Sequence, residues 1–195
     1  VLILTNSVQI GGMEEHVRLL ALHLDRERFR VTVGFPRWQP TDEFVPALAA
    51  AADDVVILTP DRRPGPQLQL HEAWRMYRHL RRSRYDVVHL HSTDWLGHNL
   101  AMFVARLARV PKIFLSEHLP PDGPQRGLHR LAQRIRFRRA TLVCISDFNR
   151  NERAKRLREP KRTEVVRNGI DTSRFDEPIP EQALAAARLE TGLDP

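Results

Sequence analysis

Cysteine and long apolar runs are scarce in this sequence. Its 195 residues include a single cysteine, Cys144, which excludes a disulfide within the chain. A lone Cys inside an apolar run is typical of a small buried side chain in a reducing compartment. No apolar run approaches the ~20 residues that a membrane-spanning helix needs, and the chain starts on apolar residues 1–4 without a basic leader. We therefore expect no signal peptide and a cytoplasmic protein.

Common nucleotide-binding and metal-binding motifs are absent too. The sequence contains neither G-x-G-x-x-G nor a phosphate-binding P-loop, and its second predicted strand ends without the acid that binds a ribose. These absences disfavour ordinary NAD or ATP binding. There is no Asp-x-Asp pair and no Cys and His set with ligand spacing, so we predict no metal site.

Positive charge dominates. The formal net charge is +7, and nearly all positive residues are arginine. Genomic base composition is one explanation, and an anionic partner, such as a phosphate-bearing substrate, a membrane surface or nucleic acid, is another. We predict no nucleic-acid binding, because no known nucleic-acid module is present and the aromatic residues do not interleave with the basic runs.

Strand and helix patterns alternate along the chain. Apolar, β-branched runs occur at residues 1–5, 30–35, 55–58, 86–91, 112–116, 142–145 and 163–167. Helical periodicity occurs at residues 13–24, 43–51, 68–82, 96–108, 128–139 and 148–158. This alternation predicts an α/β fold with a Rossmann-like, doubly wound parallel sheet over residues 1–175. Residues 176–195 read as a linker followed by a short Ala-rich helix that stops at Gly192.

Polar residues follow the predicted strands where each one ends. Ligands of open parallel sheets bind at this carboxyl edge, although any α/β domain has polar loops there. Two glycines before a helix suit a phosphate or simply form a tight turn. The candidate site residues are Gly11, Gly12, His91, Ser92, Glu117, His118, Asn168 and Gly169.

Three histidines differ in what they can do. His89 and His91 lie two apart and share one face of a strand. We interpret His89 as a buried, hydrogen-bonded side chain. His91 lies nearer the carboxyl edge of the sheet, where it could contact a ligand. His118 follows a strand and precedes prolines; it can exchange a proton or bind a sugar hydroxyl, or it is an ordinary loop residue.

A basic stripe marks one predicted helix. Four arginines recur at every fourth position, namely Arg126, Arg130, Arg134 and Arg138. Like charges at this spacing repel one another, and an anionic surface would relieve the repulsion. The stripe is either a solvated helix face or a contact with anionic membrane, which would place the protein on the inner face of the membrane.

Taken together, the motifs resemble the N-terminal domain of family-4 glycosyltransferases, which are retaining enzymes of the GT-B fold. The resemblance runs in order through Gly-Gly-Met-Glu at 11–14, Asp-Val-Val-His-Leu-His at 86–91, Ser-Glu-His at 116–118, Leu-Val-Cys-Ile-Ser at 142–146 and Asn-Gly-Ile-Asp at 168–171.

The resemblance implies a role for each candidate. Gly11 and Gly12 would meet the diphosphate of a nucleotide-sugar donor, and His118 would be the catalytic group near the transferred sugar. His91, Ser92 and Glu117 would contact the acceptor or sugar, and the segment of Asn168 and Gly169 would lead into the interdomain crossing. No cofactor is expected besides the nucleotide-sugar co-substrate. The C-terminal donor-binding domain would be missing, so this chain alone is expected to be inactive.

Two other readings remain open. A GT-B-fold sugar epimerase or a phosphorylase-like enzyme shares the same half-domain layout. A non-catalytic α/β binding module would also fit the sheet and its polar edge.

Overall fold

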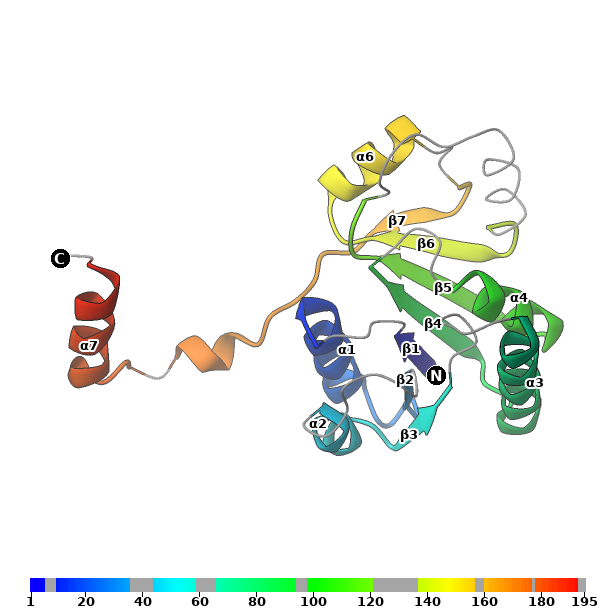
Figure 1. Ribbon diagram of the computed structural model, residues 1–195, viewed down its shortest axis with the longest axis horizontal. Coiled ribbons are helices and arrows are strands. Elements are labelled where there is room, and N and C mark those ends of the chain that lie inside the picture. Colours follow the sequence, from blue (N-terminus) through cyan, green and yellow to red (C-terminus); the bar gives the residue numbers. More distant parts are fainter. Residues whose placement is uncertain are drawn as a thin grey trace.

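A seven-stranded parallel sheet forms the centre of the molecule (Figure 1). The computed structural model describes residues 1–5, 10–35, 44–58, 66–93, 98–120, 137–156, 160–176 and 178–192. The strands are β1 (Leu2–Thr5), β2 (Thr32–Phe35), β3 (Asp54–Ile57), β4 (Val87–Ser92), β5 (Lys112–Glu117), β6 (Ala140–Cys144) and β7 (Thr163–Val165). They lie in the order β3-β2-β1-β4-β5-β6-β7, and every neighbouring pair is parallel. The predicted Rossmann-like α/β class is confirmed.

Helices connect most of the strands. They are α1 (Gly12–His23), α2 (Phe44–Ala51), α3 (Pro66–Ser83), α4 (Asn99–Leu107) and α6 (Asp147–Arg156), followed by the 3-10 helix η1 (Thr172–Phe175) and α7 (Glu181–Thr191). In the described parts of the chain, no helix combines the length and the apolar character that crossing a bilayer requires.

The two faces of the sheet have separate cores because the strand order reverses at β1. Helices α1 and α2 cover one face, where Val17 and Ala21 of α1 pack on Ile3 and Val33. Leu20 and Leu24 complete the apolar stripe of α1 that the sequence predicts. Helices α3 and α4 cover the other face, where their apolar sides pack on alternate residues of β1, β4, β5 and β6. A right-handed crossover after the reversal requires this change of face.

One half of one face is open. On the side of α1, the described residues provide no helix over β4, β5 and β6, so Phe114 and Val143 border a pocket there. The opposite face is tightly packed, because a Cβ at Gly34 of β2 would clash with Cδ2 of Leu4 there.

Most predicted elements agree with the structure to within a few residues. Strand β6 begins at Ala140, two residues earlier than predicted, because the backbone of Ala140 already pairs with Ile113 of β5. Helix α3 begins at Pro66, where proline fits the first turn since its missing N–H has no partner there. Most of the helix predicted at 128–139 lies outside the described residues, and its last residues, 137–139, form a turn instead.

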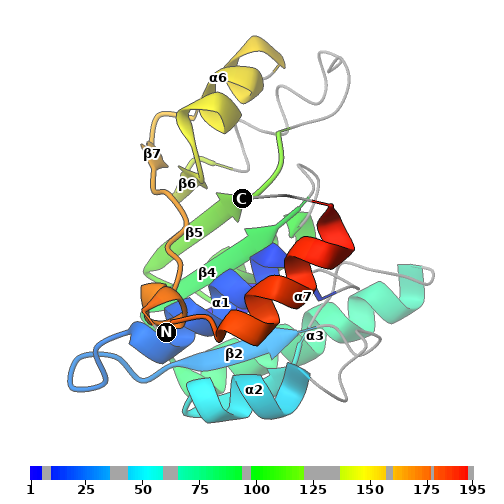
Figure 2. The ribbon, with the colours of Figure 1, turned by 90° about the vertical axis from the view of Figure 1, so that its left-hand side faces the viewer.

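The C-terminal segment extends away from the sheet. Figure 1 shows η1 and α7 to the left of α1, away from the sheet, and Figure 2 shows α7 from that side. No residue of α7 is buried, and the helix ends at Gly192 with φ of 64°, a left-handed conformation that favours glycine. The helix and its stop are as predicted, while the domain boundary at residue 175 stays a prediction.

Candidate functional site

The polar residues singled out in the sequence come together at the carboxyl edge of the sheet. His91 lies at the end of β4 opposite Thr5 of β1 and Ser116 of β5. His118 follows β5 directly, and its backbone N–H donates to the carbonyl of Ser92 at 2.9 Å. Helix α1 begins at this edge, because β1 leads into it. Gly12 and His118 therefore share one end of the sheet.

Four imidazoles form a cluster there, which we call the histidine cluster: His16, His89, His91 and His118. The rings of His89 and His91 are 4.2 Å apart between centroids, and those of His91 and His118 are 5.4 Å apart. His16 of α1 lies across from both, 5.7 Å from His91 and 5.6 Å from His118. The cluster thus joins α1 to the ends of β4 and β5.

The hydrogen bonds of the cluster assign its protons. The side-chain nitrogen of Asn168 lies 3.4 Å from Nδ1 of His118, and an amide NH₂ can only donate. Nε2 of His118 then carries the proton and donates to Nδ1 of His91 at 3.1 Å. The proton of His91 falls on Nε2, which is buried and has no partner among the described residues. Asn168, His118 and His91 therefore form one polarised chain.

Burial keeps the cluster uncharged at neutral pH. Burial, and to a smaller extent nearby His16, lowers the pKa of His118 to about 4. Burial, with His16 and His118 as neighbours, lowers the pKa of His89 to about 3. The pKa of His91 also falls well below its ordinary range, first through burial and then through the neighbouring rings. Each neutral ring keeps one donor and one acceptor.

His89 is hydrogen-bonded within the fold, as interpreted from the sequence. Its Nε2 lies 2.8 Å from Oγ of Ser116 on the adjacent strand. His91 is more enclosed than expected, with an exposed fraction of 0%. Its carbonyl accepts a hydrogen bond from Nε2 of His98 at 2.9 Å, which fixes the end of β4. His118, at 8% exposure, is closer to solvent than His91.

The two glycines at the start of α1 differ in their surroundings. The N–H of Gly11 already donates to Oε2 of Glu14 at 2.9 Å. The first bond of the helix runs from the N–H of Glu15 to the carbonyl of Gly11, so the amides of residues 12–14 have no partner within the helix. Gly12 has no heavy atom within 4 Å of its Cβ position. A phosphate would therefore meet open amides at Gly12 and a buried carboxylate beside Gly11.

Glu117 faces away from the histidine cluster. Because side chains alternate along β5, its carboxylate lies on the α3–α4 side of the sheet, where it is fully buried. Oε2 accepts a hydrogen bond from Nε of Arg153 at 2.7 Å. The backbone carbonyl of Glu117 accepts from Nδ2 of Asn149 at 3.0 Å. Glu117 thus ties α6 to the strand that precedes His118, and its predicted contact with an acceptor stays a prediction.

Ser92 is enclosed as well. Its exposed fraction is 0%, and its carbonyl holds the backbone of His118. In this structure Ser92 supports the loop of His118 rather than facing solvent. Asn168 and Gly169, in contrast, are exposed in the segment after β7, and no heavy atom lies within 4 Å of the Cβ position of Gly169.

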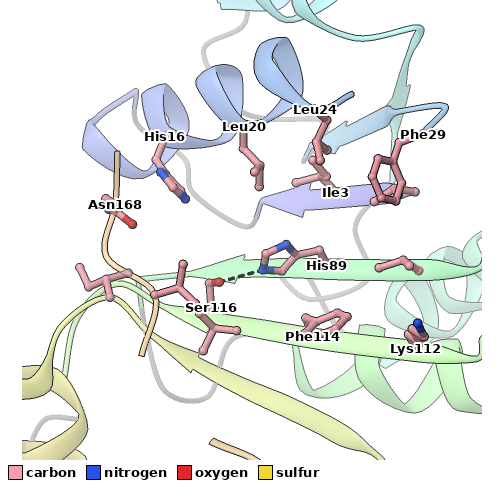
Figure 3. A pocket seen from close by; sticks show the side chains of 15 residues that line it. Ile3, His16, Leu20, Leu24, Phe29, His89, Lys112, Phe114, Ser116 and Asn168 are labelled. Atoms are coloured by element: carbon pink, nitrogen blue, oxygen red, sulfur yellow. Dashed lines mark hydrogen bonds between the residues drawn. The ribbon is translucent and has the colours of Figure 1, made fainter. Parts of the chain in front are cut away.

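A pocket of about 420 Å³ extends from the cluster along the open half of the sheet (Figure 3). Leu20 and Leu24 of α1 line one wall, and Phe114 of β5 lies on the sheet side. Polar side chains gather at the end near the carboxyl edge, where His16 and Asn168 point into the space. The pocket is thus mostly apolar along its length, with Lys112 at the far end, and polar at the site.

Sequence reasoning missed His16, Asn149 and Arg153. The spacing of His16, four residues after Gly12, could have suggested it, because this spacing places both on one side of a helix. Asn149 and Arg153 contact Glu117 across separations of 32 and 36 residues, and only the fold brings them together. In the described residues, no group of three or more His, Cys, Asp or Glu side chains has the geometry of a metal site.

Comparisons with known proteins show one family and two solved structures of similar fold. The model of Glycosyltransferase Family 4 matches residues 10–174. The crystal structure of Anabaena Alr3699/HepE in complex with UDP and glucose is similar, with a TM-score of 0.65 and 18% identity over 98% of this chain and 50% of that chain. The crystal structure of UDP-N-acetylglucosamine 2-epimerase is also similar, with a TM-score of 0.56 and 15% identity over 90% of this chain and 54% of that chain. Curated protein sequences give no match. The chain thus spans about half the length of these solved structures.

Proposed function

Because the chain belongs to glycosyltransferase family 4, we propose that it is the N-terminal, acceptor-side half of a retaining GT-B enzyme. This enzyme transfers a sugar from a nucleotide-sugar to an acceptor. One observation carries the proposal: the neutral ring of His118 is held at the carboxyl edge by His91 and Asn168, beside the start of α1. That the similar Anabaena protein was crystallised with UDP and glucose supports a nucleotide-sugar donor.

The start of α1 binds the leaving phosphate in this proposal. The amides of residues 12–14 are free of intrahelical bonds, and the positive end of the helix dipole favours an anion. Gly12 leaves room for close approach because nothing lies within 4 Å of its Cβ position. Hydrogen-bond donors that are held in place where negative charge develops supply much of the stabilisation of a transition state. The amide of Gly11 joins them only if the Glu14 carboxylate moves aside.

His118 is the catalytic group. Transfer with retention and without a protein nucleophile needs positioning, stabilisation of the leaving phosphate and one well-placed polar group. The hydrogen bond from Nε2 of His118 to His91 fixes the orientation of the ring. Nδ1, whose contact with the Asn168 amide is the longer one at 3.4 Å, would accept a hydrogen bond from a sugar or acceptor hydroxyl in place of that amide. His91 orients the ring, while Ser92 and the Glu117–Arg153 pair position the loop that carries it. Asn168 and Gly169 lead from this site toward the second half.

A C-terminal domain would bind the nucleotide of the donor. This chain spans about half of the structures it resembles, so we propose that donor binding needs a further domain and that residues 1–195 alone are inactive. The nucleotide-sugar is the only co-substrate, and neither a cofactor nor a metal is required.

We also keep the predicted location as a proposal, namely the cytoplasm with contact to the inner face of the membrane. Arg126, Arg130 and Arg134 of the predicted basic stripe lie outside the described residues. Arg138 is exposed in the turn before β6.

The test is a transfer assay on the protein with its complete C-terminal half. Release of nucleoside diphosphate is measured from a panel of nucleotide-sugars with extracts of candidate acceptors, and the anomeric configuration of the product is read by NMR. Acceptor-dependent release with retained configuration supports the proposal. Epimerised nucleotide-sugar formed without an acceptor would instead favour an epimerase, the activity in the name of the second similar structure.

A further inference from the structure

Large apolar side chains are exposed on the outer side of two neighbouring helices. On α3, Leu70 and Trp74 are 69% and 57% exposed, and on α4, Phe103 and Leu107 are 60% and 58% exposed. Each pair lies four residues apart, so its members share one side of a helix. We call these four residues, with the exposed arginines described below, the α3–α4 outer surface.

The two helices present these residues in the same direction. The inner sides of α3 and α4, with Met76, Leu80, Met102 and Ala105, pack in one core on the same face of the sheet. The helices also contact each other, and Figure 1 shows them side by side, next to β4 and β5. Since both bury their inner sides in one layer, their outer sides form one continuous surface of that layer.

Positive charge accompanies the apolar residues. Arg78, Arg81 and Arg82 are exposed on the same side of α3, within two turns of Trp74, and Arg109 is exposed just after α4. The two helices contain one acidic residue, Glu72, and its carboxylate is bonded to Arg75 at 2.8 Å. No other acid on these helices can neutralise the arginines.

The positive surface continues toward β6. Arg139, in the turn before that strand, is close enough to Arg106 to lower the pKa of its guanidinium, after the larger effect of partial burial. The turn also carries exposed Arg138. Like charges therefore adjoin one another from α4 to the turn before β6, and a surface of this kind is complementary to a dense negative charge.

We propose that the α3–α4 outer surface docks on an anionic lipid bilayer. Trp74, Leu70, Phe103 and Leu107 enter the boundary between headgroups and acyl chains, and the arginines contact lipid phosphates. Apolar residues with tryptophan, flanked by basic residues and lacking acids, are the composition of helices that lie in a membrane interface. Trp74, stacked on Tyr77 with 5.5 Å between ring centroids, is the type of side chain enriched at that depth.

A bilayer fits this surface better than a protein partner does. The exposed apolar residues lie on two helices and are accompanied by exposed arginines, a mixture that suits the boundary between headgroups and acyl chains. The charge is of one sign, so a second copy of this chain would face like charges across the contact. The proposal uses residues remote from the histidine cluster and does not depend on the proposed enzyme activity.

Co-sedimentation with vesicles tests the proposal. The purified protein is mixed with vesicles of phosphatidylcholine alone or of phosphatidylcholine with phosphatidylglycerol, at low and at raised salt. An apolar variant (Leu70→Ser, Trp74→Ser, Phe103→Ser) and a basic variant (Arg78→Gln, Arg81→Gln, Arg82→Gln) are compared with the wild type. Matched controls replace exposed residues elsewhere (Ile170→Ser, Ile179→Ser, Leu189→Ser; Arg28→Gln, Arg30→Gln, Arg162→Gln). Circular dichroism checks that every variant is folded.

We expect the wild type and both controls to bind the anionic vesicles and to be released by salt. The apolar variant and the basic variant should each bind at least about tenfold more weakly than the wild type. The reason is that each arginine near the lipid phosphates and each apolar side chain in the interface adds to the affinity for the membrane. With Trp38 and Trp95 replaced by Phe, the fluorescence of Trp74 should shift to the blue on anionic vesicles.

Three results would overturn the proposal. One is the absence of wild-type binding to anionic vesicles, and another is equal binding by the docking and control variants. The third is a dimer in sedimentation velocity that only the apolar variant dissociates, which would make this surface an interface between copies.

Discussion

The histidine cluster and the α3–α4 outer surface depart from the usual distribution of polar and apolar groups in opposite ways. In the cluster, imidazoles are taken out of water, and His91 has no exposed surface. On the outer surface, Trp74 and Phe103 remain more than half exposed. Buried polar groups and exposed apolar patches are the informative exceptions in a folded protein. In our proposals each exception has a ligand of matching polarity: a polar substrate for the cluster and a lipid surface for the helices.

The two regions also differ in how they are built. The cluster is assembled from α1, β4, β5 and the loop after β7, so its geometry depends on the whole sheet. The outer surface needs only two adjacent helices whose inner sides pack on a common core. A single substitution should therefore strongly impair the function of the histidine cluster. Binding by the α3–α4 outer surface should instead weaken stepwise as its residues are replaced.

Removing the central imidazole of the cluster has the largest expected effect. In the complete enzyme, His118→Ala should reduce kcat by about 10²–10⁴-fold, the usual range for a lost acid–base or positioning group. His23→Ala, at an exposed histidine in the last turn of α1, is the matched control. A kcat for His118→Ala within a few fold of the control would remove this residue from the mechanism.

The buried Glu117–Arg153 pair allows the stability of an interior ion pair to be compared with that of a pair at the surface. Arg153→Met leaves the fully buried Glu117 carboxylate without its guanidinium, so unfolding in urea should become easier by about 3–5 kcal/mol. Replacing both residues by apolar ones (Glu117→Leu, Arg153→Met) should restore much of this loss. Arg18→Met breaks the partly exposed Arg18–Glu15 pair and should cost less than about 1 kcal/mol. Equal losses for the two single variants would show that burial does not distinguish the two pairs.

Acid should weaken the fold through the cluster. The folded-state pKa is about 4 for His118 and about 3 for His89, below the ordinary value of 6.5. Between these values the unfolded chain binds more protons, so stability falls as pH drops below about 6.5. We expect the urea midpoint to decrease from pH 7 to pH 5 by less in a His89→Phe, His118→Asn variant than in the wild type. An unchanged decrease in the variant would locate the acid sensitivity elsewhere.

Gly12→Ala is expected to have the smallest effect. The added methyl group meets no atom within 4 Å, so stability should change by no more than about 0.5 kcal/mol. The methyl group lies where the diphosphate would approach, so the KM for the nucleotide-sugar should rise a few fold. Isothermal titration with the nucleoside diphosphate gives the same comparison without turnover. A KM equal to that of the wild type would exclude close backbone approach at this position.

Local sequence patterns predicted the fold but not the interior of the site. Alternating strand and helix signals were sufficient for the parallel sheet, and the sheet in turn brought His91, His118 and Gly12 to one edge. The side on which a residue faces was harder to predict. Glu117 and His118 are adjacent in sequence, yet Glu117 binds Arg153 of α6 while His118 faces the cluster.

The outer surface could not be predicted for a different reason. The helical pattern at residues 68–82 indicates an apolar side, but Trp74 and Leu70 read as part of it as readily as Met76 and Leu80 do. Which of them stay exposed is decided by how α3 and α4 pack on the sheet. The basic stripe at Arg126, Arg130 and Arg134, outside the described residues, stays a prediction.

The most direct test of the central claim is a crystal structure of the complete enzyme with its nucleotide-sugar or the corresponding nucleoside diphosphate. The account predicts that the diphosphate lies on the amides at the start of α1, with Gly12 in contact. It also predicts that the imidazole of His118 lies within hydrogen-bonding distance of the transferred sugar. A nucleotide bound with its phosphates away from α1, and with His118 touching neither sugar nor acceptor, would contradict it.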